Sequence, residues 1–237
     1  MNRADAAPEA RPPLAVDIDG TLTDRNRVVD PRVFDALREW PAPVVLATGK
    51  ALPYPVALCE FAGLATLVVA ENGGVVCLDT ETRDDIVVDG DRTAADRVAA
   101  AYRDAGHDLG WGSLDLVNRW RETEIAVSRD APLDPLREIA VEYGLDVVDT
   151  GFAYHVVSPD VDKGRGLSIV ADRLGRDPEE FVAIGDSAND VATFEVVGRS
   201  FAVANADEAA TQAADLVTDA AYADGFIEAL STVRSSS

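Results

Sequence analysis

Two aspartates stand one residue apart where an apolar stretch of the chain ends in a polar loop. They are Asp17 and Asp19, in the segment Asp17-Ile18-Asp19-Gly20-Thr21. A carboxylate at the end of an apolar strand is partly buried and needs a partner or a metal ion to offset the cost of desolvation. Asp17 is placed to attack phosphorus and form an acyl-phosphate, while Asp19 can protonate the leaving alkoxide and then deprotonate water. A solvated turn is the alternative if this pair is taken alone.

A second acidic segment, over 185–190, directly follows the apolar run 181–184. It contains two more carboxylates, Asp186 and Asp190, about one helical turn apart, with small residues that allow close approach. A cluster of hard oxygen ligands beside a phosphate favours Mg²⁺. A helix cap formed by Asp186 or Ser187 is an alternative that is compatible with metal binding.

The chain has only two lysines, Lys50 and Lys163. Lys163 stands where a helix is predicted to begin, and its compact ammonium charge suits a phosphoryl oxygen. Thr48 ends another predicted strand, before Gly49, and can donate its hydroxyl and its backbone N–H to the same phosphoryl group. Lys50 follows and adds positive potential. A surface lysine and a plain strand-ending threonine are the alternatives for Lys163 and Thr48.

The elements that must position these side chains alternate between strand and helix. Such alternation predicts an α/β fold with a parallel sheet covered by helices, and the carboxyl ends of its strands share one edge. Helices are expected over 31–38 and 52–62, and again over 163–174 and from 222. Strands are expected over 14–18, 44–47, 66–70, 181–184 and 201–203, with a hairpin turn at Asn72-Gly73-Gly74.

The middle of the chain has a different pattern of predicted helices and strands. Its helices, over 92–105 and 133–143, alternate with short strands, of which 86–88 comes first, and with an irregular stretch rich in glycine and tryptophan. We therefore expect a separate α+β module over 81–155, inserted into a core formed by 14–80 and 156–237, with a disordered leader over 1–13.

Taken together, these motifs resemble the haloacid dehalogenase superfamily of phosphotransferases, over about 14–231. The four signatures are Asp17-Ile18-Asp19-Gly20-Thr21, Ala47-Thr48-Gly49, Lys163 and Gly185-Asp186-Ser187-Ala188-Asn189-Asp190. The resemblance implies a Rossmann-like core with an inserted cap, and Asp17 as nucleophile with Asp19 as general acid and base. It also implies phosphoryl binding by Thr48, Gly49 and Lys163. Mg²⁺ would be organised by the carboxylates Asp17, Asp19, Asp186 and Asp190, with Asp19 meeting the metal through its backbone carbonyl.

Within the superfamily, the short cap and the Glu71-Asn72-Gly73-Gly74 turn are most similar to archaeal-type phosphoglycolate phosphatases, which implies hydrolysis of a small phosphorylated metabolite. A sugar-phosphate phosphatase, a phosphomutase and a non-catalytic phosphate-binding module are the alternatives. Specificity must come from the cap, where the candidates for binding a substrate carboxylate are Trp111, Trp120, Arg121 and His155. The tryptophans are equally compatible with cap core, and His155 with a buried, hydrogen-bonded imidazole.

Composition limits the binding partners of the protein and indicates the environment in which it works. The chain carries 43 acidic residues against 21 lysines and arginines, for a net charge of −22, which argues against nucleic acid and anionic membranes as partners. Short carboxylates with almost no lysine indicate a salt-adapted protein, since their repulsion is screened at high salt. We expect a cytoplasmic monomer or small homo-oligomer without a secretory signal, and two buried thiols, Cys59 and Cys77.

Overall fold

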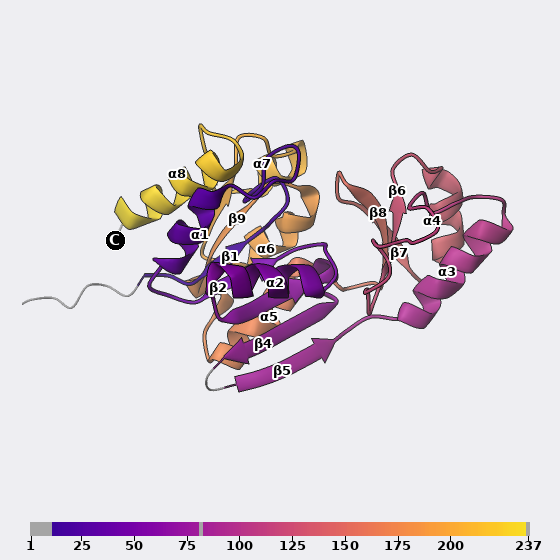
Figure 1. The fold of residues 1–237 in the computed structure, drawn as a ribbon, viewed down its shortest axis with the longest axis horizontal. Coiled ribbons are helices and arrows are strands. Elements are labelled where there is room, and N and C mark those ends of the chain that lie inside the picture. The colour runs from indigo at the N-terminus through magenta and orange to yellow at the C-terminus, as the bar shows by residue number, and fades with distance from the viewer. Residues whose placement is uncertain (1–10, 81–82, 236–237) are drawn as a thin grey trace, which may run out of the picture.

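The computed structural model describes residues 11–80 and 83–235, and within them the chain forms two sheets (Figure 1). The larger sheet has eight strands in the order β11-β10-β9-β1-β2-β3-β4-β5. Neighbouring strands are parallel from β11 to β3, and β4 and β5 are added antiparallel. The strands are β1 (Leu14–Val16), β2 (Val44–Ala47), β3 (Thr66–Ala70), β4 (Val75–Thr80), β5 (Arg83–Val88), β9 (Val182–Gly185), β10 (Arg199–Ala202) and β11 (Leu216–Val217).

Helices cover both faces of this sheet, because successive side chains of a buried strand point to opposite sides. In β1, Leu14 and Val16 join one apolar cluster while Ala15 joins the other. The first cluster includes residues of α1 (Pro31–Arg38), α2 (Pro53–Ala62) and α8 (Tyr222–Ser235). The second includes residues of α5 (Lys163–Leu174), α6 (Val191–Val196) and α7 (Glu208–Ala213). The predicted α/β architecture is confirmed.

Local chemistry explains where the first helices begin and end. Asp30 caps α1 by accepting a hydrogen bond from the backbone N–H of Arg32, with Pro31 at the first helical position. Helix α2 ends at Gly63, which adopts the left-handed conformation with φ of 71°. These boundaries agree with the sequence pattern.

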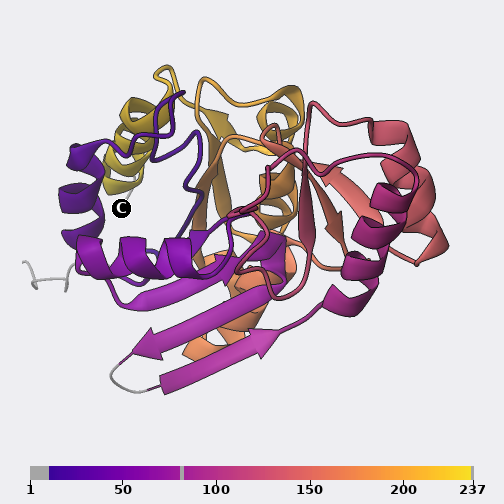
Figure 2. The same cartoon turned by 45° about the vertical axis from the view of Figure 1, so that its right-hand side comes forward.

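The second sheet is antiparallel, with strand order β6-β8-β7, and lies to one side of the large sheet (Figure 2). Two helices pack on it, and their apolar residues form a third cluster separate from the core of the large sheet. These elements are α3 (Arg92–Asp104), β6 (Ile125–Ser128), α4 (Leu133–Glu142), β7 (Asp146–Asp149) and β8 (Ala153–Val157). We refer to residues 89–161, which carry this sheet, as the cap.

Two boundaries differ from expectation. The strand expected to open the inserted module is β5, and it pairs with β4 in the large sheet, where Val87 packs against the second apolar cluster. Residues 1–10 of the leader expected over 1–13 lie outside the described residues. Its last residues bind the core: Pro12 O accepts a hydrogen bond from Trp40 Nε1, and Pro13 O accepts one from the N–H of Val182. The division into domains stays a prediction.

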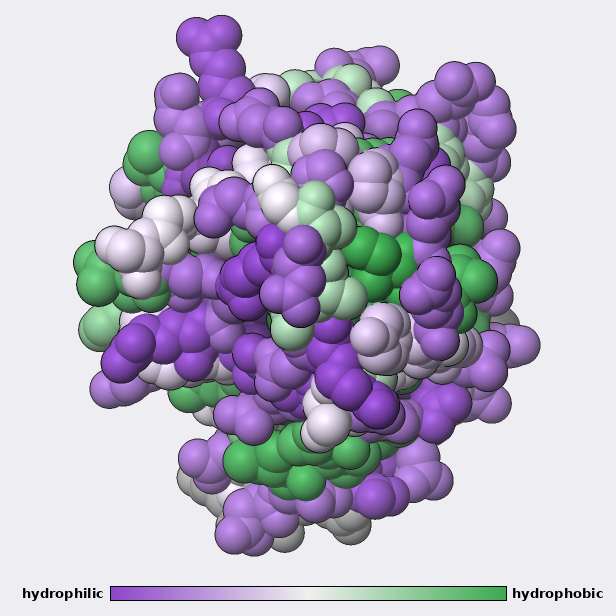
Figure 3. Space-filling view, turned by 90° about the vertical axis from the view of Figure 1, so that its right-hand side faces the viewer, coloured by the Kyte–Doolittle hydropathy of each residue, from purple (hydrophilic) through white to green (hydrophobic). Residues whose placement is uncertain are grey.

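The surface and the buried thiols follow the composition. Hydrophilic residues dominate the cap-side face, and apolar residues on it form separate patches (Figure 3). Cys59 and Cys77 are both buried, as predicted. No helix in the described part of the chain is long and apolar enough to cross a membrane.

Candidate active site

The predicted site residues meet at the carboxyl edge of the large sheet. Asp17, Thr48 and Asp186 directly follow β1, β2 and β9, which are adjacent in the sheet. The chain runs from β1 to β2 on one side and returns through β9 on the other, so these loops surround a topological switch point, where α/β sheets bind ligands. Lys163, the first residue of α5, reaches the same point.

Lys163 joins two of the carboxylates. Its Nζ lies 2.7 Å from Asp17 Oδ1 and 2.7 Å from Asp190 Oδ1, and its side chain is 0% exposed. Burial by itself lowers the pKa of an ammonium group, but the two carboxylates outweigh it and raise the pKa of Lys163. A buried lysine held in this way fixes the orientation of Asp17.

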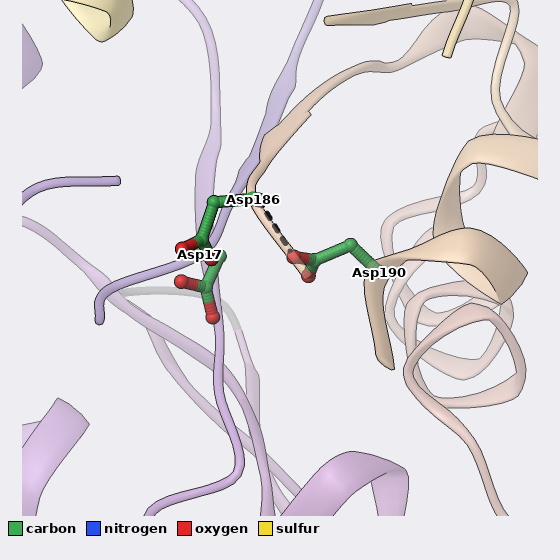
Figure 4. A group of neighbouring side chains, drawn as sticks. All are labelled: Asp17, Asp186 and Asp190. Carbon is green, nitrogen blue, oxygen red and sulfur yellow. Dashed lines mark hydrogen bonds between the residues drawn. The ribbon is translucent and has the colours of Figure 1, made fainter. Parts of the chain in front are cut away.

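The carboxylates of Asp17, Asp186 and Asp190 each offer an oxygen within 4.8 Å of the others (Figure 4). Asp17 Oδ2 and Asp186 Oδ1 are buried and have no hydrogen-bond partner among the described residues. Burial, reinforced by the neighbouring carboxylates, raises the pKa of Asp17 to about 7 and that of Asp186 to about 9. Unpartnered buried oxygens with this much mutual repulsion fit a hard divalent cation.

Asp190 belongs to this cluster and also binds the local backbone. Its Oδ2 accepts hydrogen bonds from the backbone N–H groups of Asp186 and Ser187, at 3.0 and 3.1 Å. Ser187, one of the two predicted cap residues, is the N-cap of the short helix Ala188–Asp190, so the cap and the carboxylate cluster occur together.

Gly20 allows the loop after β1 to approach the loop after β9 closely. A Cβ at Gly20 would lie 1.9 Å from Asp186 Oδ2, and Gly20 has φ of 86°. Asn205 supports the same contact by donating to Gly20 O at 2.9 Å. Sequence reasoning missed Asn205, and its place just after β10, next to β9 in the sheet, was the available signal.

Asp19 lies apart from the three-carboxylate group. Its Oδ2 is 3.0 Å from Lys50 Nζ, and its Oδ1 is buried without a hydrogen-bond partner in the described part of the chain. Lys50, for which the sequence predicts only added positive potential, is thus the counter-ion of Asp19. Metal contact through the backbone carbonyl of Asp19 stays a prediction.

Thr48 differs in part from expectation. It is fully buried, but its backbone N–H donates to Val69 O at 2.8 Å and extends the pairing of β2 with β3. The expected donation of this N–H to a phosphoryl group is therefore wrong for this structure, because the sheet uses it. Its Oγ1 accepts from the N–H of Lys50 at 3.1 Å and keeps its own hydrogen to donate.

A cavity of about 40 Å³, partly open to solvent, lies between these residues and the cap. The core contributes Asp17, Asp19, Thr48, Gly49 and Lys50 to its lining, and the cap contributes Arg121, Thr150, Phe152 and His155. Trp111 and Trp120 are not among its lining residues. Trp111 Nε1 donates to Ala126 O within the cap, and Trp120 makes an edge contact with Tyr54.

Glu71 and Asn72 hold the cap against the core. Glu71 is buried, and its carboxylate accepts hydrogen bonds from the backbone N–H groups of Glu122 and Thr123 and from Thr123 Oγ1 at 2.7 Å. Asn72 Nδ2 donates to Glu124 Oε2 at 3.0 Å, and Asn72 Oδ1 accepts from Asn189. The sequence predicted this segment only as a turn, and the missed signal is its acidic residue at the end of an apolar strand.

The comparisons with known proteins agree with this geometry. The family model of haloacid dehalogenase-like hydrolases matches residues 14–103 and 141–230. The chain belongs to this family.

Relatives with high identity include a phosphoglycolate phosphatase of Haloarcula marismortui, 60% identical over 94% of this chain and 97% of that protein. Another, of Archaeoglobus fulgidus, is 41% identical over 92% and 94%. A crystal structure of Thermoplasma acidophilum 0175 has the same fold, with a TM-score of 0.80, 24% identity and coverage of 94% of this chain and 98% of that one.

Proposed function

We propose that the protein is a Mg²⁺-dependent phosphomonoesterase that hydrolyses 2-phosphoglycolate to glycolate and phosphate through an aspartyl-phosphate on Asp17. The observation that carries the proposal is the buried Lys163–Asp17 pair, with Oδ2 of Asp17 left without a partner among the described residues. Relatives 57–60% identical to this chain bear the name phosphoglycolate phosphatase, which supports the substrate.

In the first step, a carboxylate oxygen of Asp17 attacks phosphorus, and the bond between phosphorus and the glycolate oxygen breaks. Asp19 donates its proton to the departing oxygen. Thr48 Oγ1 and Lys163 Nζ bind phosphoryl oxygens, and Lys163 keeps Asp17 oriented for in-line attack.

In the second step, Asp19 accepts a proton from water, and the water oxygen attacks phosphorus. The bond to Asp17 breaks, phosphate leaves and both carboxylates return to their starting states. Asp17, Asp186 and Asp190, with the carbonyl of Asp19, would hold Mg²⁺. When bound, the ion offsets the negative charge of the carboxylates and the phosphate.

The inserted sheet with α3 and α4 would act as the cap that sets specificity. A cavity that the cap narrows from one side favours a small substrate over a sugar phosphate, which is the second candidate. A phosphomutase would need a bisphosphate to restore the phosphoenzyme, and a binding module would not need both Asp17 and Asp19.

The test is a phosphate-release panel with 2-phosphoglycolate, glucose 6-phosphate and 4-nitrophenyl phosphate, run with Mg²⁺ at low and high salt. Preferred release from 2-phosphoglycolate supports the proposal, and the absence of release from all three contradicts it. Trapping of a phosphorylated Asp17 in Asp19→Asn with 4-nitrophenyl phosphate, whose leaving group needs no proton, tests the intermediate.

The acidic composition supports a further part of the proposal, adaptation of the protein to high salt in the cytoplasm, as a monomer or small homo-oligomer. The relatives include proteins of Halobacterium salinarum and Halorubrum lacusprofundi.

A further inference from the structure

Arg121 places a buried positive charge in the cap, directly opposite the reacting groups of the core. It lies between α3 and β6 and lines the same cavity as Asp17 and Thr48. Its side chain is 3% exposed. A guanidinium buried to this degree needs partners for its N–H groups, because each unpaired donor carries a desolvation cost.

The described residues provide partners for Nε and Nη1 of this guanidinium. Nη1 donates to Gly49 O at 2.9 Å and contacts Glu124 Oε1, and Nε donates to Val117 O at 3.0 Å. An arginine has five N–H donors, of which Nη2 carries two. Nη2 has no hydrogen-bond partner within residues 11–80 and 83–235.

Glu124 is not available to Nη2. Its Oε1 is shared by Arg121 Nη1 and by His155 Nδ1, which lies at 2.7 Å, and its Oε2 accepts from Asn72 Nδ2. Each of these groups is buried. The free donors of Nη2 are therefore left for a molecule that enters the cavity.

The hydrogen bond from Arg121 Nη1 to Gly49 O limits the distance between phosphorus and an anionic group that Arg121 binds. Gly49 follows Thr48, so the guanidinium lies beside the loop that would bind the phosphoryl group. An anionic group bound by Nη2 must then be only a few atoms from phosphorus. In 2-phosphoglycolate a single CH₂ separates the ester oxygen from the carboxylate, whereas a hexose phosphate presents hydroxyl groups at this distance.

We infer that Arg121 determines specificity by binding the substrate carboxylate through Nη2, an inference that rests on the proposed function. A guanidinium with a free N–H group on Nη2 matches a carboxylate in charge and can donate a charge-assisted hydrogen bond to it. The position is fixed before substrate arrives, because Glu71 binds the backbone N–H groups of Glu122 and Thr123, the next two residues. Such preorganisation reduces the entropic cost of binding.

The experiment compares two substrates of the same chain length, 2-phosphoglycolate and ethyl phosphate, which lacks only the carboxylate. The proteins are wild type, Arg121→Gln, Arg121→Lys and the control Arg119→Gln, which removes an exposed arginine two residues away. We expect Arg121→Gln to lower kcat/KM for 2-phosphoglycolate about 10- to 100-fold, the range for loss of a charge-assisted hydrogen bond, and to leave ethyl phosphate nearly unchanged. Arg121→Lys should lose less, and Arg119→Gln should match wild type.

A merely structural role for Arg121 predicts a different pattern, in which the values of kcat/KM for both substrates fall together. That result would overturn the inference, as would an unchanged preference for 2-phosphoglycolate. If thermal unfolding shows that Arg121→Gln does not fold, Arg121→Lys is judged by the same ratio of kcat/KM for the two substrates, since it keeps the charge and loses the planar guanidinium. The proposed function is tested by the wild-type protein alone, and it fails if this protein releases phosphate from neither substrate. If wild type hydrolyses both equally well, the carboxylate contact is wrong while phosphatase activity stands.

Discussion

Lys163 Nζ lies 2.7 Å from Asp17 Oδ1, at a depth where the lysine is 0% and the aspartate 5% exposed. The contact leaves Asp17 with one oxygen held and one oxygen without a partner in the described chain. Lys163 thereby orients Asp17, and Asp17 lines the cavity beneath the cap.

Asp17→Asn should abolish turnover, by a factor on the order of 10³ or more, while the fold is kept. The amide is nearly isosteric with the carboxylate but cannot form an acyl-phosphate. Phosphate release and circular dichroism measure the two effects, with the exposed Asp104→Asn as matched control. Substantial activity in a folded Asp17→Asn protein would remove Asp17 from the nucleophile position.

Lys163→Arg should behave as a severe substitution although it preserves the charge. A fully buried ammonium that bridges two carboxylates at 2.7 Å leaves no room for a planar guanidinium. We expect kcat/KM to fall at least about 10-fold, as when a charged hydrogen bond is lost. Arg97→Lys, on the exposed side of α3, is the control and should retain wild-type kinetics. Near-wild-type rates for Lys163→Arg at saturating Mg²⁺ would mean that any positive charge suffices.

Removal of divalent metal should stop activity, and the two carboxylates of the 185–190 segment should respond differently to substitution. Asp186 Oδ1 is unpartnered among the described residues, so Asp186→Ala should mainly raise the Mg²⁺ concentration needed for half-maximal activity. Asp190 binds Lys163 and two backbone N–H groups, so Asp190→Ala should mainly destabilise, by about 3–5 kcal/mol. Metal titration of activity and denaturant unfolding separate these effects. Full activity after exhaustive chelation would reject the metal site.

The metal-free protein should lose stability as the pH rises from about 4 to 9. Burial raises the pKa of Asp17 to about 7 and of Asp186 to about 9, from an ordinary value of 3.8. Between these limits the folded state binds more protons than the unfolded state, so the free energy of unfolding falls with pH. Asp186→Asn should flatten the curve of Tm against pH, measured with a chelator at constant high salt. Parallel curves for wild type and variant would contradict the assignment.

The free energy of unfolding should rise as salt increases from about 0.1 M to molar concentrations. A net charge of −22 destabilises the compact state through self-repulsion, and the Debye length falls to about 3 Å at 1 M. Denaturation by urea, which is uncharged, measures the effect in KCl. A stability that is flat or falls with KCl would reject the salt adaptation.

The sequence by itself determined the order of the elements and the residues that meet at the sheet edge. Apolar runs such as 44–47 and 66–70 are too short for helices in this alternating context, and Asp30-Pro31 and Gly63 mark helix ends through purely local chemistry. Because parallel strands share a carboxyl edge, the position of Asp17, Thr48 and Asp186 directly after strands was enough to predict that they converge.

Only the tertiary structure decided which atoms these side chains use. The sequence could not show that the N–H of Thr48 is taken by Val69, that Lys50 faces Asp19, or that Glu71 binds the backbone of the cap. It also could not assign β5 to the large sheet, because a strand this short fits either sheet and only its pairing with β4 decides between them. Hydrogen-bond and ion-pair partners 20 or more residues apart depend on how the whole chain packs, which no local pattern specifies.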